Sequence, residues 1–126
     1  MSKIVINTAD APAPIGPYNQ AIEINGMIFI SGQVALIPGS NDLQMDTIES
    51  ETKQVMKNLE AILTQAGLNF GHVVKTSIFL MDMKDFATVN AIYANYFLSD
   101  FPARETVQVS GLPRGVNVEI SMIAAR

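Results

Sequence analysis

The sequence predicts an α+β fold, in which a mixed β-sheet carries two helices on one face. Candidate strands and helices follow one another in the order β-β-β-α-β-α-β-β. Each helix lies between two strands, which is typical of crossover connections. The chain has 126 residues, of which 48% are apolar and 16% charged, so it is long enough for one domain with a hydrophobic core but not for two.

The first part of the chain contains three candidate strands. Residues 4–6 are short and apolar, and residues 20–24 and 27–31 flank Asn25-Gly26. Asn-Gly between apolar strands is a strong hairpin signal because both residues tolerate positive φ. The segment ADAPAPIGPYNQA before the hairpin is rich in proline, and we expect it to form an ordered loop.

Two later segments show helical spacing of their apolar residues. We expect Thr47 or Ser50 to cap the first helix, which should end before Gly67. Asp82 or Asp85 lies near the start of the second helix and favours a capping role there. The residues that mark the two helices are Val55, Met56, Leu59, Ile62, Leu63 and Ala66 in the first, and Phe86, Val89, Asn90, Tyr93 and Phe97 in the second.

The candidate strand over residues 72–81 is apolar on both faces. Because side chains alternate along a strand, we expect Val74, Ile78 and Leu80 on one face and Val73, Phe79 and Met81 on the other. Two helices can cover only one face of the sheet. A second copy of the chain is the simplest cover for the other face, so the pattern predicts a homo-oligomer.

The segment PARETVQVSGLPRGVNVEI, residues 102–120, indicates two further strands joined by a turn. Arg104, Thr106 and Gln108 should share one face, and Asn117, Glu119 and Ser121 should share a face of the other strand. If the two strands pair as a hairpin with Thr106 opposite Glu119, Arg104 lies diagonally from Glu119, about 7–8 Å away at the backbone. That spacing suits a small ligand between a guanidinium and a carboxylate. The alternative is an ordinary ion pair on the surface.

Composition excludes several kinds of function. The chain has no cysteine and one histidine, His72, which opens a strand and is expected to be a loop-end residue, so a transition-metal cluster is not expected. The net charge of −4 disfavours a nucleic-acid or anionic-membrane binder. No signal-like or membrane-spanning apolar run is present, and we expect a cytoplasmic protein. Tyr18 could either pack in the core or present its hydroxyl to a site.

Four separated motifs together resemble the RidA/YjgF family of reactive-intermediate imine deaminases. IGPYNQA at 15–21 is similar to the family's IGPYSQA, and FISGQVAL at 29–36 resembles its SGQ segment. Residues 54–93 are similar to the family's central block, and residues 102–120 resemble its Pro-Ala-Arg signature with a Leu-Pro turn and Glu-Ile. The resemblance covers residues 4–124, so residues 1–126 are expected to form a single RidA/YjgF-like domain.

The resemblance implies a fold like that of bacillary chorismate mutase and a homotrimer with three clefts between subunits. It also implies hydrolysis of the enamine and imine intermediates 2-aminoacrylate/2-iminopropanoate and 2-iminobutanoate to 2-oxo acids and ammonia, as a form of metabolite damage control. Neither a metal nor an organic cofactor is implied.

The same resemblance implies roles for seven residues. Arg104 matches the arginine that binds the substrate carboxylate, and Glu119 matches the glutamate that positions water and moves protons. Five more match positions that line the cleft: Tyr18, Ser31, Gly32, Asn90 and Thr106, the last of which stands where the family often has Cys and contributes its backbone carbonyl.

The chain departs from the family pattern at two positions, and two other functions compete with the deaminase. Glu105 replaces a small residue beside Arg104, and Asn19 replaces a serine. Glu105 should point away from the Arg104 face by alternation, whereas a bend toward Arg104 would let it compete with the substrate. One alternative function is a non-catalytic trimer that binds a 2-oxo acid or amino acid and regulates a partner. The other is RNA cleavage, which the acidic composition and the lack of a His pair disfavour.

Overall fold

The hairpin turn at Asn25-Gly26 forms as the sequence predicts. The computed structural model describes residues 2–126, and in it both turn residues have positive φ, 52° at Asn25 and 78° at Gly26. The turn joins β2 (Ala21–Ile24) to β3 (Met27–Gln33) in antiparallel register, with Ile24 opposite Met27. β1 (Ile4–Ile6) pairs with the outer edge of β2.

Of the two candidate caps, Thr47 is the N-cap of helix α1 (Ile48–Gln65), and Ser50 is its partner in a capping box. The hydroxyl of Thr47 accepts a hydrogen bond from the Ser50 N–H at 3.0 Å, and the Ser50 hydroxyl accepts one from the Thr47 N–H at 3.1 Å. This reciprocal capping box satisfies two donors at the helix start. The helix ends at Gln65 with Ala66 as its C-cap, and Gly67 follows with φ 76° as predicted.

Helix α2 (Phe86–Ala94) is shorter than its aromatic spacing indicates. A 3₁₀ turn (Met83–Asp85) precedes it, and Asp82 caps this turn by accepting from the Lys84 N–H at 2.9 Å. The prediction that Phe97 belongs to the helix was wrong, because the chain leaves α2 after Ala94. Phe97 instead packs against the rings of Phe70 and Tyr93, with centroids 5.6 Å and 4.8 Å apart.

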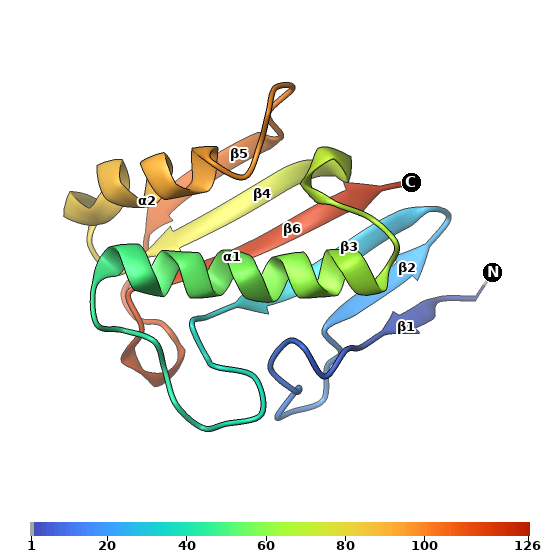
Figure 1. Ribbon diagram of the computed structural model, residues 1–126, viewed down its shortest axis with the longest axis horizontal. Coiled ribbons are helices and arrows are strands. Elements are labelled where there is room, and N and C mark those ends of the chain that lie inside the picture. The colour runs from blue at the N-terminus through green and yellow to red at the C-terminus, as the bar shows by residue number, and fades with distance from the viewer. Residues whose placement is uncertain (1) are drawn as a thin grey trace.

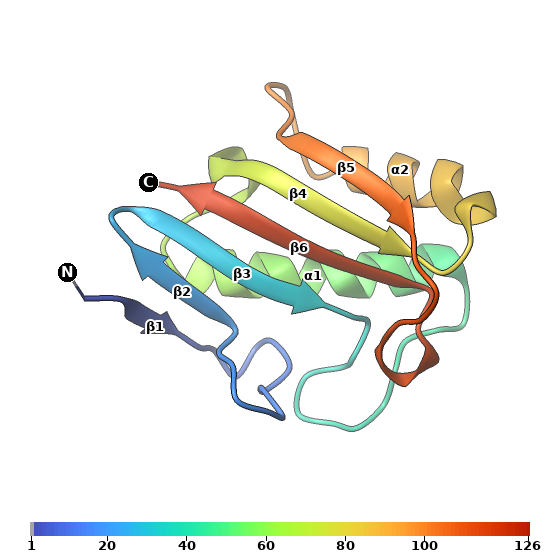
Figure 2. The ribbon, with the colours of Figure 1, turned by 180° about the vertical axis from the view of Figure 1, so that it is seen from behind.

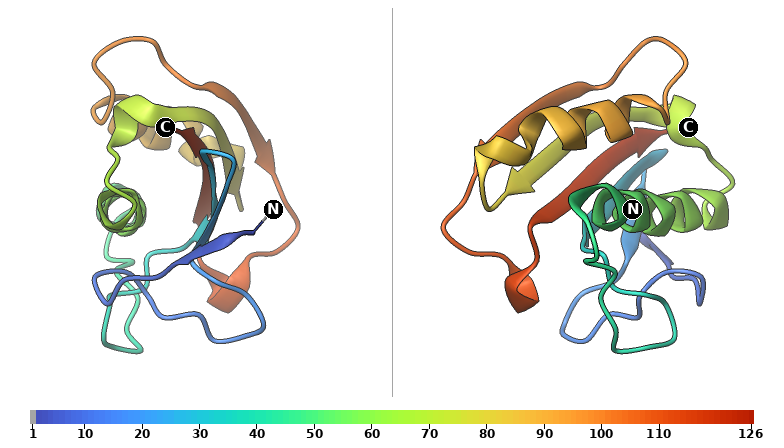
Figure 3. Two further views of the ribbon diagram at one scale, coloured as in Figure 1. Left: turned by 90° about the vertical axis from the view of Figure 1, so that its right-hand side faces the viewer. Right: turned by 60° about the vertical axis from the view of Figure 1, so that its left-hand side comes forward.

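The sheet has six strands in the order β1-β2-β3-β6-β4-β5, where β4 is Val73–Leu80, β5 is Ala103–Gln108 and β6 is Val118–Ala125. Only β4 and β5 run parallel as neighbours, so the sheet is mixed. Both helices lie on one face, and the other face is uncovered (Figures 1 and 2). The edge-on view shows α1 almost end-on beside the strands (Figure 3). The predicted element order and the two helices on one face are confirmed.

The predicted pairing of the last two strands was wrong. β4 lies between β5 and β6, so Arg104 and Glu119 are on strands that do not touch. The crossover through α2 places β5 directly beside β4. The chain then returns past β4 through residues 109–117, which include the 3₁₀ turn Pro113–Gly115.

A bulge in β4 also changes one predicted face. The register between β4 and β6 shifts between Val73 and Lys75. Val73 is consequently buried on the helix side, in register with Ala124, whereas Val74 is 46% exposed. The predicted grouping of Val74 with Ile78 and Leu80 was therefore wrong. A bulge inserts one residue and inverts the alternation on one side of it.

The hydrophobic core fills the space between the helices and the covered face of the sheet. Its largest fully buried side chains include Met56, Leu59, Ile62 and Leu63 of α1 and Ile28, Ile78, Leu80 and Ile120 of the sheet. The uncovered face carries apolar side chains as well, among them Ile22, Phe29, Phe79, Val107 and Ile123. Within residues 2–126 no helix is long and apolar enough to cross a membrane.

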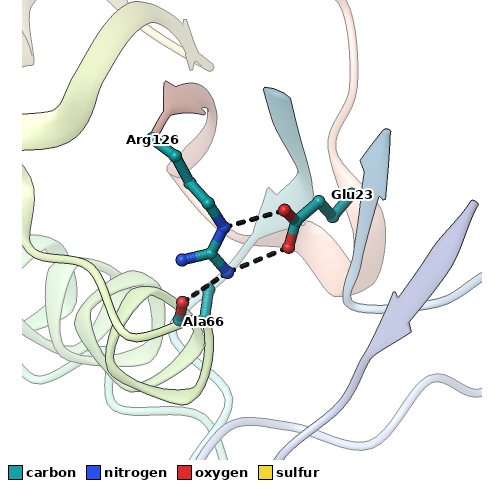
Figure 4. A network of polar contacts seen from close by, with 3 residues as sticks. All are labelled: Glu23, Ala66 and Arg126. Atoms are coloured by element: carbon teal, nitrogen blue, oxygen red, sulfur yellow. Dashed lines mark hydrogen bonds and ion pairs between the residues drawn. The ribbon is translucent and has the colours of Figure 1, made fainter. Parts of the chain in front are cut away.

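Arg126 joins three separate elements at one end of the sheet (Figure 4). Its guanidinium donates to both carboxylate oxygens of Glu23 on β2, at 2.7 Å and 2.9 Å, and to the carbonyl oxygen of Ala66 at the end of α1, at 2.7 Å. This fork geometry matches the carboxylate. The hydrogen bond from Arg126 lowers the pKa of Glu23 below its ordinary value.

Candidate active site

Arg104 on β5 lies in a hollow of about 420 Å³ beside α2. We call this the arginine hollow, and it is lined by Asn90, Tyr93, Ala94, Phe101, Pro102 and Arg104. The structure thus brings together two of the predicted site residues, Arg104 and Asn90. Tyr93, which the sequence marked only as a helix residue, and Phe101, which sequence reasoning did not single out, also line it.

Aromatic rings of α2 hold the guanidinium of Arg104. Its Cζ lies 5.1 Å from the ring centroid of Tyr93 and 5.9 Å from that of Phe86, which is the distance range of cation–π contacts. Within residues 2–126 no carboxylate pairs with this guanidinium. The rings therefore orient the cation while its N–H groups remain available to an incoming carboxylate.

Tyr93 acts as a fixed platform in this arrangement. It is buried, and its hydroxyl donates a hydrogen bond to Thr76 Oγ1 at 2.9 Å. Burial raises the pKa of Tyr93, and the Thr76 hydrogen bond and the Arg104 charge offset only part of this increase. Tyr93 consequently stays neutral at physiological pH and contributes its ring face, not an acid–base group.

Thr106, two residues beyond Arg104, does not line the arginine hollow. Its hydroxyl oxygen is buried and has no hydrogen-bond partner in the described chain. The side chain is in register with the buried Ile78 of β4. Its hydroxyl is therefore not offered to a ligand in this hollow, and the part predicted for its backbone carbonyl stays a prediction.

Glu119 on β6 lies in a second, smaller hollow of about 130 Å³. We call this the carboxylate hollow, and it includes two further predicted residues, Tyr18 and Gly32. Burial raises the pKa of the Glu119 carboxyl above its ordinary value, and no hydrogen bond to this group is formed within residues 2–126. The remaining lining is mostly apolar: Pro12, Ala13, Ile15, Val34, Leu36 and Pro113, with the polar Gln20, Gln33 and Arg114. The hollow thus offers one unpartnered carboxyl in a largely apolar setting.

Gly32 makes room for the Glu119 side chain. A Cβ on residue 32 would lie 2.8 Å from Cδ of Glu119, which is closer than Cβ atoms approach others in proteins, and a tight 3.1 Å from Cγ. Gly32 sits where the β3–β6 register shifts, between Ile30 and Gln33. The bulge and the missing side chain together allow the carboxyl to stand against the β3 backbone.

Ser31 is tied to the proline-rich loop and lines neither hollow. Its hydroxyl donates to the carbonyl oxygen of Asn19 at 2.6 Å, and its N–H donates to that of Gln20 at 2.9 Å. These bonds fix the loop that presents Tyr18, whose side chain is half exposed. Ser31 is therefore bonded to this loop, and its predicted part in the cleft stays a prediction.

Gln20 is a residue that sequence reasoning missed. Its side chain is buried, accepts from the Thr8 N–H at 2.7 Å, and donates to the carbonyl oxygens of Thr8 and Pro12, both at 2.9 Å. It thereby orders the loop on which Tyr18 stands. The signal was available in principle, because a proline-rich loop has carbonyl groups that need donors from elsewhere.

The two hollows lie on opposite faces of one sheet. Arg104 is in register with Thr76, which is buried beneath the helices, whereas Glu119 is in register with Phe79 on the uncovered face. Side chains in register share a face and successive residues alternate. The two hollows have no lining residue in common. The prediction that Arg104 and Glu119 face each other across a hairpin within one chain was therefore wrong.

Glu105 does not compete for Arg104. Its carboxylate pairs with the ammonium of Lys75 at 2.8 Å and accepts a hydrogen bond from the Ser77 hydroxyl. These partners, Lys75 first, lower the pKa of Glu105. The side chain thus points away from Arg104, as alternation predicts, and the arginine keeps its free donors.

His72 and the acidic residues form no metal site in the part of the chain that the structure describes. The Nδ1 atom of His72 accepts from the Asn69 N–H at 3.2 Å and closes the 3₁₀ turn Phe70–His72. No group of three or more His, Asp or Glu side chains in residues 2–126 is placed to hold a metal ion. The predicted structural role of His72 at a strand entrance is confirmed.

Comparisons with known proteins give one consistent result. A family model described as endoribonuclease L-PSP matches residues 8–126. A mouse (Mus musculus) protein named 2-iminobutanoate/2-iminopropanoate deaminase is 52% identical over 97% of this chain and 90% of its own length. A human protein of the same name is 48% identical over 95% of this chain and 88% of its own. The solved structure of YyfA, a conserved Rid-family protein from Yersinia pestis, superposes with a TM-score of 0.96 at 48% identity and covers 99% of this chain and 100% of YyfA.

Proposed function

Because the chain belongs to the RidA/YjgF family, which the endoribonuclease L-PSP model describes, we propose that it hydrolyses the C=N bond of small 2-imino acids. The products are a 2-oxo acid and ammonia, and the substrates are 2-iminopropanoate, 2-iminobutanoate and their enamine tautomers such as 2-aminoacrylate. The observation that carries the proposal is a pair of groups that have no partner among residues 2–126, the guanidinium of Arg104 and the half-buried carboxyl of Glu119.

The active site is completed by a second copy of the chain. Arg104 and Glu119 lie on opposite faces, so one chain cannot apply both groups to a small substrate. A head-to-tail contact brings the arginine hollow of one protomer to the carboxylate hollow of the next, and such contacts close into a ring. We propose a homotrimer with three such sites, in which the apolar uncovered face of the sheet is buried between subunits.

Arg104 binds and orients the substrate. Its guanidinium forms two parallel hydrogen bonds with the substrate carboxylate, which fixes the plane of the adjacent C=N group. The Tyr93 and Phe86 rings hold the guanidinium in place through cation–π contacts. Asn90 offers a further polar group in the lining of the hollow. Because the C=N group is held in one orientation, the entropic part of the barrier to attack by water is lower.

Glu119 moves the protons. As a carboxylate it accepts a proton from the attacking water while the oxygen bonds to the imine carbon. It then returns this proton to the imine nitrogen, which gives the neutral carbinolamine. Glu119 next accepts the hydroxyl proton of the carbinolamine and delivers it to the amino nitrogen, so the C–N bond breaks, ammonia leaves and the C=O bond forms. The raised pKa of Glu119 lies closer to neutral pH than that of an ordinary carboxyl, which suits a group that must both accept and donate a proton.

Two alternative functions are less well supported. A non-catalytic sensor would need the arginine hollow but would have no use for Glu119. A nuclease is disfavoured by the net charge of −4, which repels nucleic acid. We also expect the protein to be cytoplasmic.

The test is hydrolysis of an imine generated in place. An amino-acid oxidase or a dehydratase supplies 2-iminobutanoate, and the loss of imine is followed with and without the purified chain. We expect acceleration by the wild type and none by Arg104→Ala or Glu119→Gln. Lack of acceleration by the folded wild type would contradict the proposal and favour the sensor.

A mixed oligomer tests whether the site is shared. Arg104→Ala and Glu119→Gln, co-expressed with different tags, should regain activity, because some interfaces combine an intact arginine with an intact glutamate. For random trimers, about a quarter of sites are restored. Mixed assemblies that stay inactive would contradict a site shared between protomers.

A further inference from the structure

A buried carboxylate on α1 holds the start of the strand that carries Glu119. Glu51, in the first turn of α1, is fully buried. Its Oε2 accepts from the N–H groups of Asn117 and Val118 at 2.7 Å and 3.2 Å, and its Oε1 accepts from Asn117 Nδ2 at 2.8 Å. These two partners immediately precede Glu119 in sequence.

The first residues of β6 need this support because β3 ends before it can pair with them. The last β3–β6 register pair is Gln33–Ile120, so Val118 and Glu119 have β4 on one side and no β3 partner on the other. Buried N–H groups without an acceptor are costly. The Glu51 carboxylate provides the acceptors at this end of the sheet.

Burial of a charge is itself unfavourable unless hydrogen bonds compensate it. Here three donors converge on one carboxylate that also stands near the positive end of a helix dipole. The result is a short, directional link from the buried face of α1 to the backbone beneath Glu119.

We propose that Glu51 is a positioning residue that fixes the Glu119 carboxyl for proton transfer. The inference depends on the role of Glu119 proposed above. Glu51 lines neither hollow, so it acts only through the β6 backbone. Loss of its acceptors lets the first residues of β6 move, and a displacement of about 1 Å at a reacting group lowers turnover strongly.

The arginine hollow is formed by α2, β5 and the segment that joins them, and its lining includes none of the residues of this link. A change at Glu51 therefore lowers kcat and leaves KM nearly unchanged, since the substrate carboxylate is still bound by Arg104. A general loss of fold would instead reduce the active fraction and the melting temperature together.

Three variants at one position separate hydrogen bonding from charge. Glu51→Gln keeps an oxygen for the two backbone donors, and the Asn117 amide can turn its own oxygen toward the new NH₂. Glu51→Asp keeps the charge but is one methylene too short, and Glu51→Leu removes every acceptor. We expect Gln to retain most of the wild-type kcat, and Asp and Leu to lose about tenfold or more with KM unchanged. Glu49→Asp, an exposed acid in the same helical turn, should behave as wild type.

The pH profile adds a signature that a merely structural residue would not move. Loosening of β6 hydrates the Glu119 carboxyl, so the acidic limb of kcat shifts to lower pH in Glu51→Asp and stays in place in Glu51→Gln. A wild-type kcat in folded Glu51→Asp, or a rise in KM that matches the fall in kcat, would overturn the inference even if Glu51→Leu does not fold.

Glu119→Gln, assayed beside these variants, separates the two proposals. If it is inactive while Glu51→Asp is fully active, only the positioning role fails. Full activity of Glu119→Gln removes the role of Glu119 and the inference with it.

Discussion

The side chain of Glu119 fills the space that a Cβ on Gly32 would occupy. Cδ of the carboxyl and Cγ of the adjacent methylene would lie 2.8 Å and 3.1 Å from that Cβ, and the carboxyl Oε2 would lie closer still. Since the obstacle is the end of a side chain and not backbone, an alanine can be accommodated if Glu119 moves. The β3 backbone therefore sets where the carboxyl stands.

Gly32→Ala should consequently remove activity while it preserves the fold. We expect kcat to fall about tenfold or more because the proton-transfer group is displaced, with a smaller effect on KM. Steady-state kinetics and circular dichroism check this. Gly111→Ala is the matched control, because a Cβ at Gly111 meets no atom within 4 Å. Equal activity of the two variants would show that the carboxyl does not need its observed place.

Local patterns predicted the elements of this fold well. Asn25-Gly26 predicts its hairpin, and Thr47, one of the two cap candidates, is the N-cap of α1, because turn chemistry and capping depend on residues that are near in sequence. The assignment of Glu119 to a face opposite Val118 and Ile120 also holds, since it depends only on alternation.

Strand order could not be obtained in the same way. Consecutive strands usually pair, so residues 102–120 read as a hairpin, yet β4 intervenes because the α2 crossover places β5 against it. The consequence for the site is large, because it separates Arg104 from Glu119. Gln20 and Glu51 were missed because their partners, at positions 8–12 and 117–118, are brought near only by the tertiary fold.

The acidic limb of the pH–rate profile should report Glu119. Burial raises its pKa above the ordinary 4.5, and the carboxylate is the form that accepts a proton from water. Activity should therefore fall as the pH decreases through a value above 4.5, while KM for the substrate changes little because Arg104 stays charged. The dependence of kcat on pH measures this. A limb at or below 4.5 would contradict a half-buried catalytic carboxyl.

The same raised pKa predicts that Glu119→Gln stabilises the protein near neutral pH. When the pKa of a carboxyl is higher in the folded than in the unfolded state, its ionisation is disfavoured in the folded state. The protein therefore becomes less stable as the pH rises through the folded pKa. The melting temperature of Glu119→Gln should thus exceed that of the wild type at pH 7, and the difference should shrink below about pH 4.5. Thermal unfolding at several pH values tests it, and a wild type that is more stable at pH 7 would contradict it.

Tyr93 allows the ring and the hydroxyl to be tested separately. Tyr93→Phe keeps the ring beside Arg104 but leaves Thr76 Oγ1 without its donor, so we expect a loss of about 1–2 kcal/mol in stability and an unchanged KM. Tyr93→Leu removes the ring face and should raise KM several-fold because the guanidinium loses its orientation. Denaturant unfolding and kinetics measure the two effects. An equal KM in both variants would show that the ring does not position Arg104.

Arg126→Lys should lower stability without changing catalysis. A lysine ammonium cannot donate at once to both oxygens of Glu23 and to the Ala66 carbonyl, as the guanidinium does (Figure 4). Because Arg126 lowers the pKa of Glu23, this stabilisation is present above the ordinary carboxyl pKa of 4.5 and is lost as Glu23 is protonated at lower pH. The difference in melting temperature between wild type and Arg126→Lys should therefore be largest near neutral pH and decrease on acidification. Neither residue lines a hollow, so kcat and KM serve as the control, and a pH-independent difference would show that the Glu23 pair does not contribute.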